Sequence, residues 1–122
     1  MDPRFEHVAI AEETVFRGEV QSSLARSLGE TDGWLWGSLV FGGVHALNAL
    51  FISSGDRVRH LTTSVPFITV AGSWLGLSYR WHRYSLAPSV AEHFWYNTVQ
   101  SAVFFVLDPQ HSPLSASVAF PF

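Results

Sequence analysis

The side chains best suited to chemistry in this sequence are carboxylates, imidazoles and an amide that interrupt apolar stretches. Glu12 and Glu13 stand next to each other, and Arg17 follows Glu13 by four residues. Residues four apart share one face of a helix, so Glu13 and Arg17 can form an ion pair. Successive residues are rotated by about 100° around a helix, so Glu12 points elsewhere and stays free to face a partner. A free carboxylate of this kind is a candidate acid–base group.

Two later pairs have the same helical spacing. Phe41 and His45 are four residues apart, and so are His93 and Asn97. A lone histidine on an apolar helix is more often a hydrogen-bonded core residue than a catalyst. Ionisable groups inside a membrane are costly, however, and usually face a common cavity. We therefore expect the glutamates and both histidines to converge if their helices lie in a bilayer.

The composition favours a membrane protein. Of 122 residues, 48% are hydrophobic and 14% are charged, whereas soluble domains are about 25% charged. The net charge is −3 and the sequence contains no basic block, so no nucleic acid is expected as a partner. Because there is no cysteine, disulfides and thiolate metal sites are excluded.

The distribution of charges predicts the helices that carry these groups. A first helix is expected over 5–28, with Thr31 or Asp32 capping the next one. Residues 33–55 and 61–79 carry no fixed charge, and each run approaches or exceeds the roughly 20 residues that a bilayer requires. A last helix is expected over 86–107, where the following Asp-Pro pair stops it.

These spans predict an all-α fold, namely a polytopic membrane helix bundle of about four helices. Residues 1–122 would form a single domain, with 109–122 as a loose C-terminal tail. Gly72 and Gly76 form a small-residue stripe that lets another helix approach closely. The alternative fold class is a very apolar soluble helical domain.

The three polar clusters, taken in order, resemble a known set of motifs. Residues 12–17 fit the pattern EExxxR, residues 41–45 fit FxxxH, and residues 93–97 fit HxxxN. This combination is similar to the CPBP family of intramembrane proteases, also called Abi, which includes the CAAX prenyl endopeptidases and bacteriocin-processing enzymes. Each motif is weak alone, but the ordered set is specific, and the resemblance spans residues 10–99.

The resemblance implies that Glu12 activates the attacking water. Glu13 and Arg17 would be the supporting pair that orients the site, and Phe41 a supporting residue of the second motif. The implied reaction is hydrolysis of a peptide bond by activated water, as in a CAAX-protease-like endopeptidase, without a covalent acyl-enzyme. The sequence agrees, because it has no cysteine nucleophile and no serine in a nucleophile-elbow pattern.

The resemblance also implies that His45 and His93 are essential and that Asn97 helps to hold the oxyanion. His45 and Asn97 are suitable hydrogen-bond donors for that purpose. A zinc-dependent version of the protease would use Glu12, His45 and His93, because one carboxylate and two imidazoles form a known catalytic zinc ligand set. We favour the version without a cofactor, because Asn97 stands where a histidine or carboxylate would bind zinc better.

The expected partners are a peptide or membrane-protein substrate and the lipid bilayer, in a multi-pass arrangement in a prokaryotic inner membrane. Family members usually carry further helices ahead of the first motif, so this chain is expected to be a fragment, or a minimal form that needs further subunits or self-association. Glu92 either supports a histidine or faces the rim of the site. Two other functions fit the same residues: a catalytically silent membrane scaffold or immunity-type protein, and an ion- or metal-binding membrane protein.

Overall fold

The computed structural model describes residues 3–110 of the chain, with side chains described from His7 onward. Its first helix runs without interruption as α1 (Pro3–Glu13), the π-helical segment η1 (Thr14–Gln21) and α2 (Ser22–Leu28). The helix predicted over 5–28 is confirmed. Its π-helical turns cover part of the EExxxR motif, and π-helical turns inside α-helices are frequently found at functional sites.

The second helix follows the first after a single residue. Gly29, which has a φ of 96°, ends α2 and precedes α3 (Glu30–Ala46), which continues as the 3₁₀ helix η2 (Leu47–Phe51). The predicted cap at Thr31 or Asp32 is wrong, because Gly29 itself occupies the N-cap position and no side chain caps the helix. Glycine adopts this φ without strain, which lets the chain reverse at once.

The third helix begins earlier than its charge-free part suggested. α4 (Ser54–Arg59), the π-helical η3 (His60–Ser64) and α5 (Val65–Trp81) follow one another directly, in place of a helix limited to 61–79. The turns of α4 are charged and exposed, so hydropathy did not reveal them. The π-helical segment lies just before Pro66, whose ring lacks the N–H that an α-helix uses.

The fourth helix, α6 (Leu86–Leu107), has the bounds predicted for it. It follows α5 after a short connection in which Arg83 and Tyr84 adopt positive φ values of 56° and 62°. Of the tail predicted over 109–122, residues 111–122 lie outside the described part of the chain.

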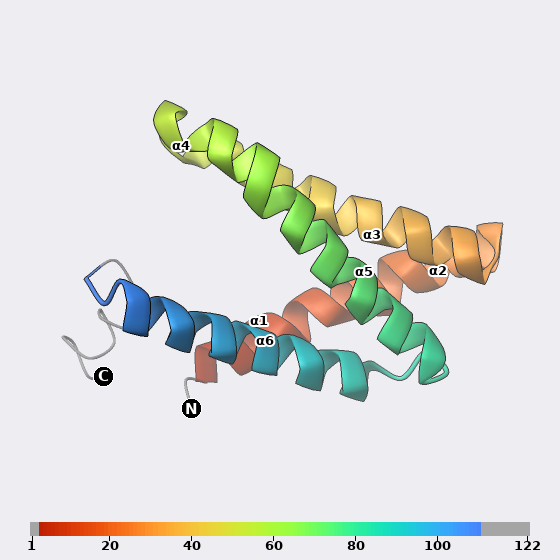
Figure 1. The fold of residues 1–122 in the computed structure, drawn as a ribbon. Coiled ribbons are helices and arrows are strands. Elements are labelled where there is room, and N and C mark those ends of the chain that lie inside the picture. Colours follow the sequence, from red (N-terminus) through yellow and green to blue (C-terminus); the bar gives the residue numbers. More distant parts are fainter. Residues whose placement is uncertain (1–2, 111–122) are drawn as a thin grey trace.

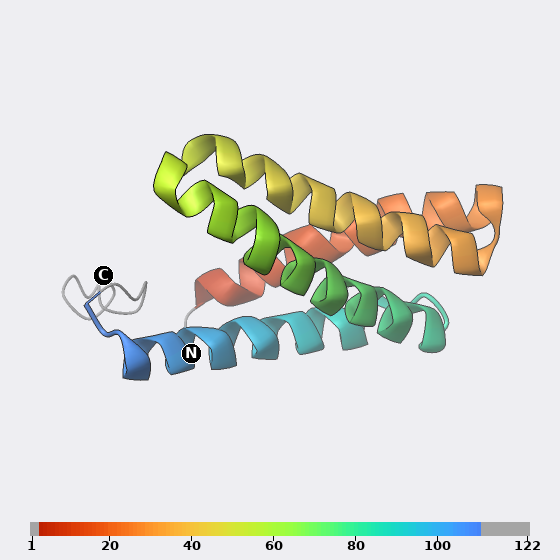
Figure 2. The ribbon, with the colours of Figure 1, turned by 45° about the horizontal axis from the view of Figure 1, so that its top comes forward.

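The four long helices form a bundle around the first one. α1 packs against α6, while α2, at the other end of the same helix, packs against α3 (Figure 1, Figure 2). α3 in turn packs along α5, and α5 and α6 are close at their connection and diverge away from it (Figure 1, Figure 2). No strand occurs among residues 3–110. The predicted all-α helix bundle is confirmed.

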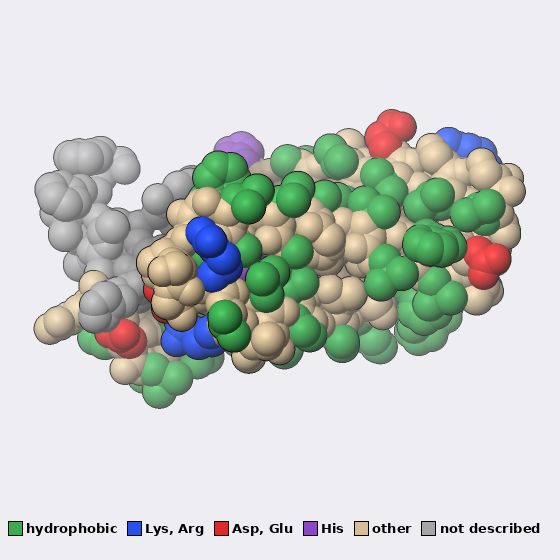
Figure 3. All heavy atoms as spheres, turned by 90° about the horizontal axis from the view of Figure 1, so that it is seen from above, with side chains coloured by type: hydrophobic (Ala, Val, Ile, Leu, Met, Phe, Trp, Pro, Cys, Tyr) green, Lys and Arg blue, Asp and Glu red, His purple; other side chains and the backbone are tan. Residues whose placement is uncertain are grey.

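Large apolar side chains cover much of the outside of this bundle. Among the most exposed are Val70, Trp81 and Val106, and Figure 3 shows hydrophobic side chains spread over one face with few charged ones between them. By length and composition, one helix of the described residues, Glu30–Phe51, could cross a membrane. The multi-pass arrangement therefore stays a prediction.

α3 and α5 approach each other closely at Gly42. A Cβ atom built there would lie 2.9 Å from Cβ of Thr69. We expect Gly42→Ala to lower the free energy of unfolding by about 1–3 kcal/mol, the usual cost of overpacking. Gly43→Ala is the matched control, since a Cβ there has no neighbour within 4 Å and alanine is the better helix former. Equal thermal unfolding midpoints of the two variants in detergent would contradict this packing.

Candidate active site

A buried ion pair lies where the helices meet. Glu13 and Arg17 are 0% and 2% exposed, and Nε of Arg17 lies 3.3 Å from Oε2 of Glu13. This is the pair that their spacing predicted. The other carboxylate oxygen of Glu13, Oε1, accepts a hydrogen bond of 2.8 Å from Nδ1 of His93 on α6. Glu13 therefore joins the first helix to the last one.

Arg17 reaches the two remaining helices. Its Nη2 donates a hydrogen bond to the backbone carbonyl of Gly72 on α5, and its guanidinium carbon lies 4.5 Å from the ring centroid of Phe41 on α3. A cation within about 6 Å of an aromatic ring centroid is attracted to the ring. Buried charges are found where they are paired and hydrogen-bonded, and here the partners come from the first helix, α3 and α5.

Two glycines of α5 make these contacts possible. A Cβ atom at Gly72 would lie 2.8 Å from Cε1 of Phe41, so a larger residue would force α3 and α5 apart. One turn further on, the Gly76 carbonyl accepts a hydrogen bond of 2.9 Å from Nε2 of Gln21, which is almost fully buried. The predicted small-residue stripe is confirmed. Sequence reasoning missed Gln21, although its position four residues after Arg17 was a signal.

A pocket of about 220 Å³ opens beside the ion pair. The four residues predicted to be catalytic all line it: Glu12, His45, His93 and Asn97. The rest of the lining comes from Phe41, residues of α5, Val8 of α1, and Tyr96 and Gln100 of α6. The structure therefore brings the three sequence motifs to one cavity, while the supporting pair Glu13 and Arg17 lies behind it, shielded from solvent.

Glu12 and Glu13 both contact His93, although their spacing in the sequence did not predict a shared partner. Oε1 of Glu13 faces Nδ1 of His93, and Oε2 of Glu12 lies 3.5 Å from Nε2 of that ring. The two carboxylates differ in access, since the Glu12 side chain is 29% exposed and the Glu13 side chain 0%. His93 therefore lies between an enclosed carboxylate and one that faces the pocket.

His45 is oriented by its own helix. Its Nδ1 lies 2.8 Å from the backbone oxygen of Phe41, one turn earlier, and the ring centroids of the two residues are 4.5 Å apart. A carbonyl oxygen can only accept a hydrogen bond, so Nδ1 of His45 carries a proton. A neutral imidazole protonated at Nδ1 presents a lone pair at Nε2.

Comparison with known proteins agrees with the motifs. Residues 5–99 match the model of the type II CAAX prenyl endopeptidases described as Rce1-like. The chain belongs to this family. No curated protein and no solved structure matches it. The Rce1-like endopeptidases are membrane-embedded proteases that act on peptides, and the matched segment contains every motif residue from Glu12 to Asn97.

A zinc-dependent version of the protease would use Glu12, His45 and His93, which all line the pocket. Among the described residues, no group of three or more His, Cys, Asp or Glu side chains is arranged to hold a metal ion. The Glu13 carboxylate holds Nδ1 of His93, however, as carboxylates do for histidines that bind zinc, and Nε2 faces Glu12. The choice between the versions with and without zinc therefore stays a prediction.

Glu92 forms a hydrogen bond with a residue of α5. Its Oε1 accepts a hydrogen bond of 2.8 Å from Oγ of Ser78 on α5. In the described structure it therefore links α5 to α6, close to their connection, and its role at the site stays a prediction. Adjacent residues of a helix point in different directions, which separates Glu92 from His93.

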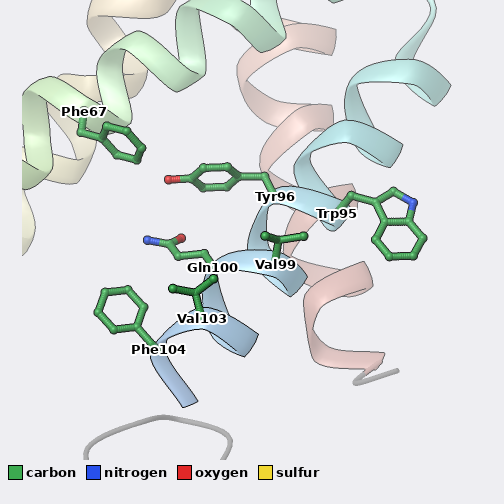
Figure 4. Close-up of a pocket in the computed structure, with 7 residues that line it drawn as sticks. All are labelled: Phe67, Trp95, Tyr96, Val99, Gln100, Val103 and Phe104. Atoms are coloured by element: carbon green, nitrogen blue, oxygen red, sulfur yellow. The ribbon is translucent and has the colours of Figure 1, made fainter. Parts of the chain in front are cut away.

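An apolar groove of about 450 Å³ adjoins the pocket, between α5 and α6. It is lined by Phe67, Trp95, Tyr96, Val99, Gln100, Val103 and Phe104. Tyr96 and Gln100 line both the groove and the pocket that contains the motif residues. In Figure 4 the Tyr96 ring and the Gln100 side chain extend toward the side of Phe67, while Trp95 points the other way. An apolar surface thus leads to the polar pocket.

Arg17→Met removes the charge that balances Glu13. We expect the free energy of unfolding in detergent to fall by about 3–5 kcal/mol, because a buried carboxylate loses its partner. Adding Glu13→Gln should recover part of this loss, since the uncompensated charge is then gone. Arg59→Met is the control, because its ion pair with Asp56 is exposed and contributes little. An Arg17→Met protein as stable as Arg59→Met would contradict the burial of the pair.

Proposed function

We propose that the chain is an intramembrane endopeptidase that hydrolyses a peptide bond with water activated by Glu12, without a covalent acyl-enzyme. The observation that carries this proposal is the shared pocket of Glu12, His45, His93 and Asn97. A carboxylate, two imidazoles and an amide supply the acceptors and donors that hydrolysis by activated water requires.

His45 and Glu12 are suited to hold the attacking water. With its proton on Nδ1 donated to the Phe41 carbonyl, a neutral His45 offers only an acceptor at Nε2. The Glu12 carboxylate is a second acceptor on the same pocket. Water has two O–H groups, so one can be donated to each. This assignment differs from the sequence-based prediction that His45 donates to the oxyanion.

His93 and Asn97 are suited to hold the oxyanion instead. Nδ1 of His93 donates to Glu13, and a second proton on Nε2 would make the ring a donor on the side of Glu12. The two carboxylates of Glu12 and Glu13 would balance the positive ring, as opposite charges at this distance favour one another. The Asn97 amide supplies a neutral N–H donor.

The reaction then balances with Glu12 as the only group that changes protonation. The water oxygen attacks the peptide carbonyl carbon while its proton passes to Glu12. The carbonyl oxygen becomes an oxyanion, which the Nε2 proton of His93 and the amide of Asn97 stabilise. When the C–N bond breaks, Glu12 returns its proton to the leaving amine, and the carboxylate is restored.

The apolar groove between α5 and α6 favours a substrate that has an apolar stretch, in a peptide or a membrane protein. Its walls are aromatic and aliphatic, and it meets the pocket at Tyr96 and Gln100. A peptide segment could therefore leave the bilayer interior along the groove and present one backbone bond at Glu12. The apolar outer surface supports a multi-pass arrangement in the membrane.

A catalytically silent scaffold is the second candidate, and one observation favours it. The buried network of Glu13, Arg17 and His93 joins the first helix to α5 and α6 whether or not any reaction occurs. His93→Ala takes a hydrogen bond from the buried Glu13 and so lowers stability under either function. His45→Ala separates them, because a scaffold predicts that it unfolds the protein, whereas the endopeptidase predicts that it abolishes cleavage in a protein that still inserts in the membrane.

Glu12→Gln separates these functions because it removes the base and keeps the shape of the side chain. We expect cleavage to fall by about 10²–10⁴-fold with unchanged insertion. The control is Glu19→Gln, an exposed position on the same helix. The measurement is a comparison of protein termini in membranes that contain wild type or either variant. New protein termini should occur with wild type and Glu19→Gln only. Undiminished cleavage by Glu12→Gln would contradict the proposal.

Metal removal tests the mechanism without zinc. We expect protein that has been dialysed against a strong chelator to retain its cleavage rate, because in the proposed mechanism the Glu12 carboxylate activates the water. The rate is measured on the same membranes or on the purified chain before and after dialysis. Loss of cleavage that zinc restores would overturn this mechanism and leave the endopeptidase activity intact.

A further inference from the structure

The end of the helix that carries His45 is held by side chains of the helix that follows. α3 ends at Ala46 and continues as the 3₁₀ helix η2. Nε2 of His60, the first residue of η3, lies 3.0 Å from the backbone oxygen of His45. Nε of Arg57, about one turn earlier, donates a hydrogen bond of 2.8 Å to the backbone oxygen of Ala49. His60 and Arg57 thus hydrogen-bond to backbone oxygens that lie about one turn apart near the end of this helix.

Side chains can add hydrogen bonds to the backbone near the end of a helix. The His45 carbonyl lies where α3 passes into the 3₁₀ helix η2, and the backbone N–H of Leu47 is directed to it. A carbonyl oxygen has two lone pairs, so it can accept a hydrogen bond from a side chain as well, and histidine and arginine side chains can donate to carbonyls near the end of a helix. Because a carbonyl only accepts, His60 carries a proton on Nε2. His45 meanwhile donates its own Nδ1 proton to the Phe41 carbonyl, one turn back. Both the ring and the carbonyl of His45 are therefore fixed by hydrogen bonds.

We propose that His60 is a positioning residue for His45. By holding the His45 carbonyl, His60 sets the rotation of the last turn of α3, and so the direction in which Nε2 of His45 faces the pocket that it shares with Glu12. None of the three sequence motifs contains His60. The π-helical segment η3 starts at this residue, and such segments are frequent at functional sites. The inference rests on the proposed function, in which Nε2 of His45 accepts a hydrogen bond from the attacking water.

The first test needs no substrate. Protein labelled with ¹⁵N-histidine is studied by NMR in detergent micelles, and the spectrum of His45→Gln assigns the His45 signals. In wild type the His45 ring should carry its proton on Nδ1. His60→Ala should shift these signals or mix the two tautomers, whereas Arg57→Ala, which loses the neighbouring contact at Ala49, should leave them in place. Unchanged His45 signals in His60→Ala would overturn the proposal.

The second test measures turnover of a synthetic peptide that contains the cleavage site identified from the membrane comparison. We expect kcat of His60→Ala to fall by about 10- to 100-fold with little change in KM, because small misplacements of a reacting group cost rates of this order. His60→Gln should recover part of kcat, since its amide can donate to the same carbonyl. Arg57→Ala should keep the kcat of wild type.

These outcomes separate positioning from simple helix capping. An equal loss of kcat in Arg57→Ala, or no loss in His60→Ala, would overturn the role of His60 and leave the endopeptidase intact. If wild type cleaves no peptide or membrane protein, the proposed function fails, and the NMR comparison still decides whether His60 orients His45.

Discussion

The buried charge of Glu13 is the constraint on which the rest of the structure depends. A carboxylate with no exposed surface is costly unless it is paired and hydrogen-bonded. Arg17 supplies the countercharge on one oxygen and His93 a hydrogen bond on the other. Each partner brings its own requirements, because a buried guanidinium and an imidazole also need acceptors. The helices are therefore fixed relative to one another by the need to satisfy a single buried ion.

The buried ion pair also explains why a small residue is required at the contact between Arg17 and α5. Arg17 can reach a backbone carbonyl of α5 only where no side chain stands in the way, which explains the glycine at position 72. The same glycine lets Phe41 pack against α5 and beneath the guanidinium. The pocket that contains Glu12, His45, His93 and Asn97 lies beside this arrangement. The charge of Glu13, which orients His93, is therefore enclosed, while the carboxylate of Glu12 stays accessible.

Local signals in the sequence predicted much of this. Glycine at position 29 marked the end of the first helix, and the spacing of Glu13 and Arg17 predicted their ion pair. Contacts between helices could not be predicted in this way. The spacing of residues shows which of them share a face of one helix, but not which other helix packs against that face. The shared contact of both glutamates with His93, and the hydrogen bond from Gln21 to α5, therefore became visible only in the structure.

The protonation states of His45 and His93 decide which of the two holds the attacking water and which holds the oxyanion. ¹⁵N NMR of the histidine-labelled chain in micelles at neutral pH distinguishes protonated from unprotonated ring nitrogens, with His45→Gln and His93→Gln used for assignment. The account predicts protons on both nitrogens of His93, which lies between Glu12 and Glu13, and on Nδ1 alone of His45. A neutral His93 together with a His45 protonated at Nε2 would contradict it, because donors and acceptors in the pocket would then be exchanged.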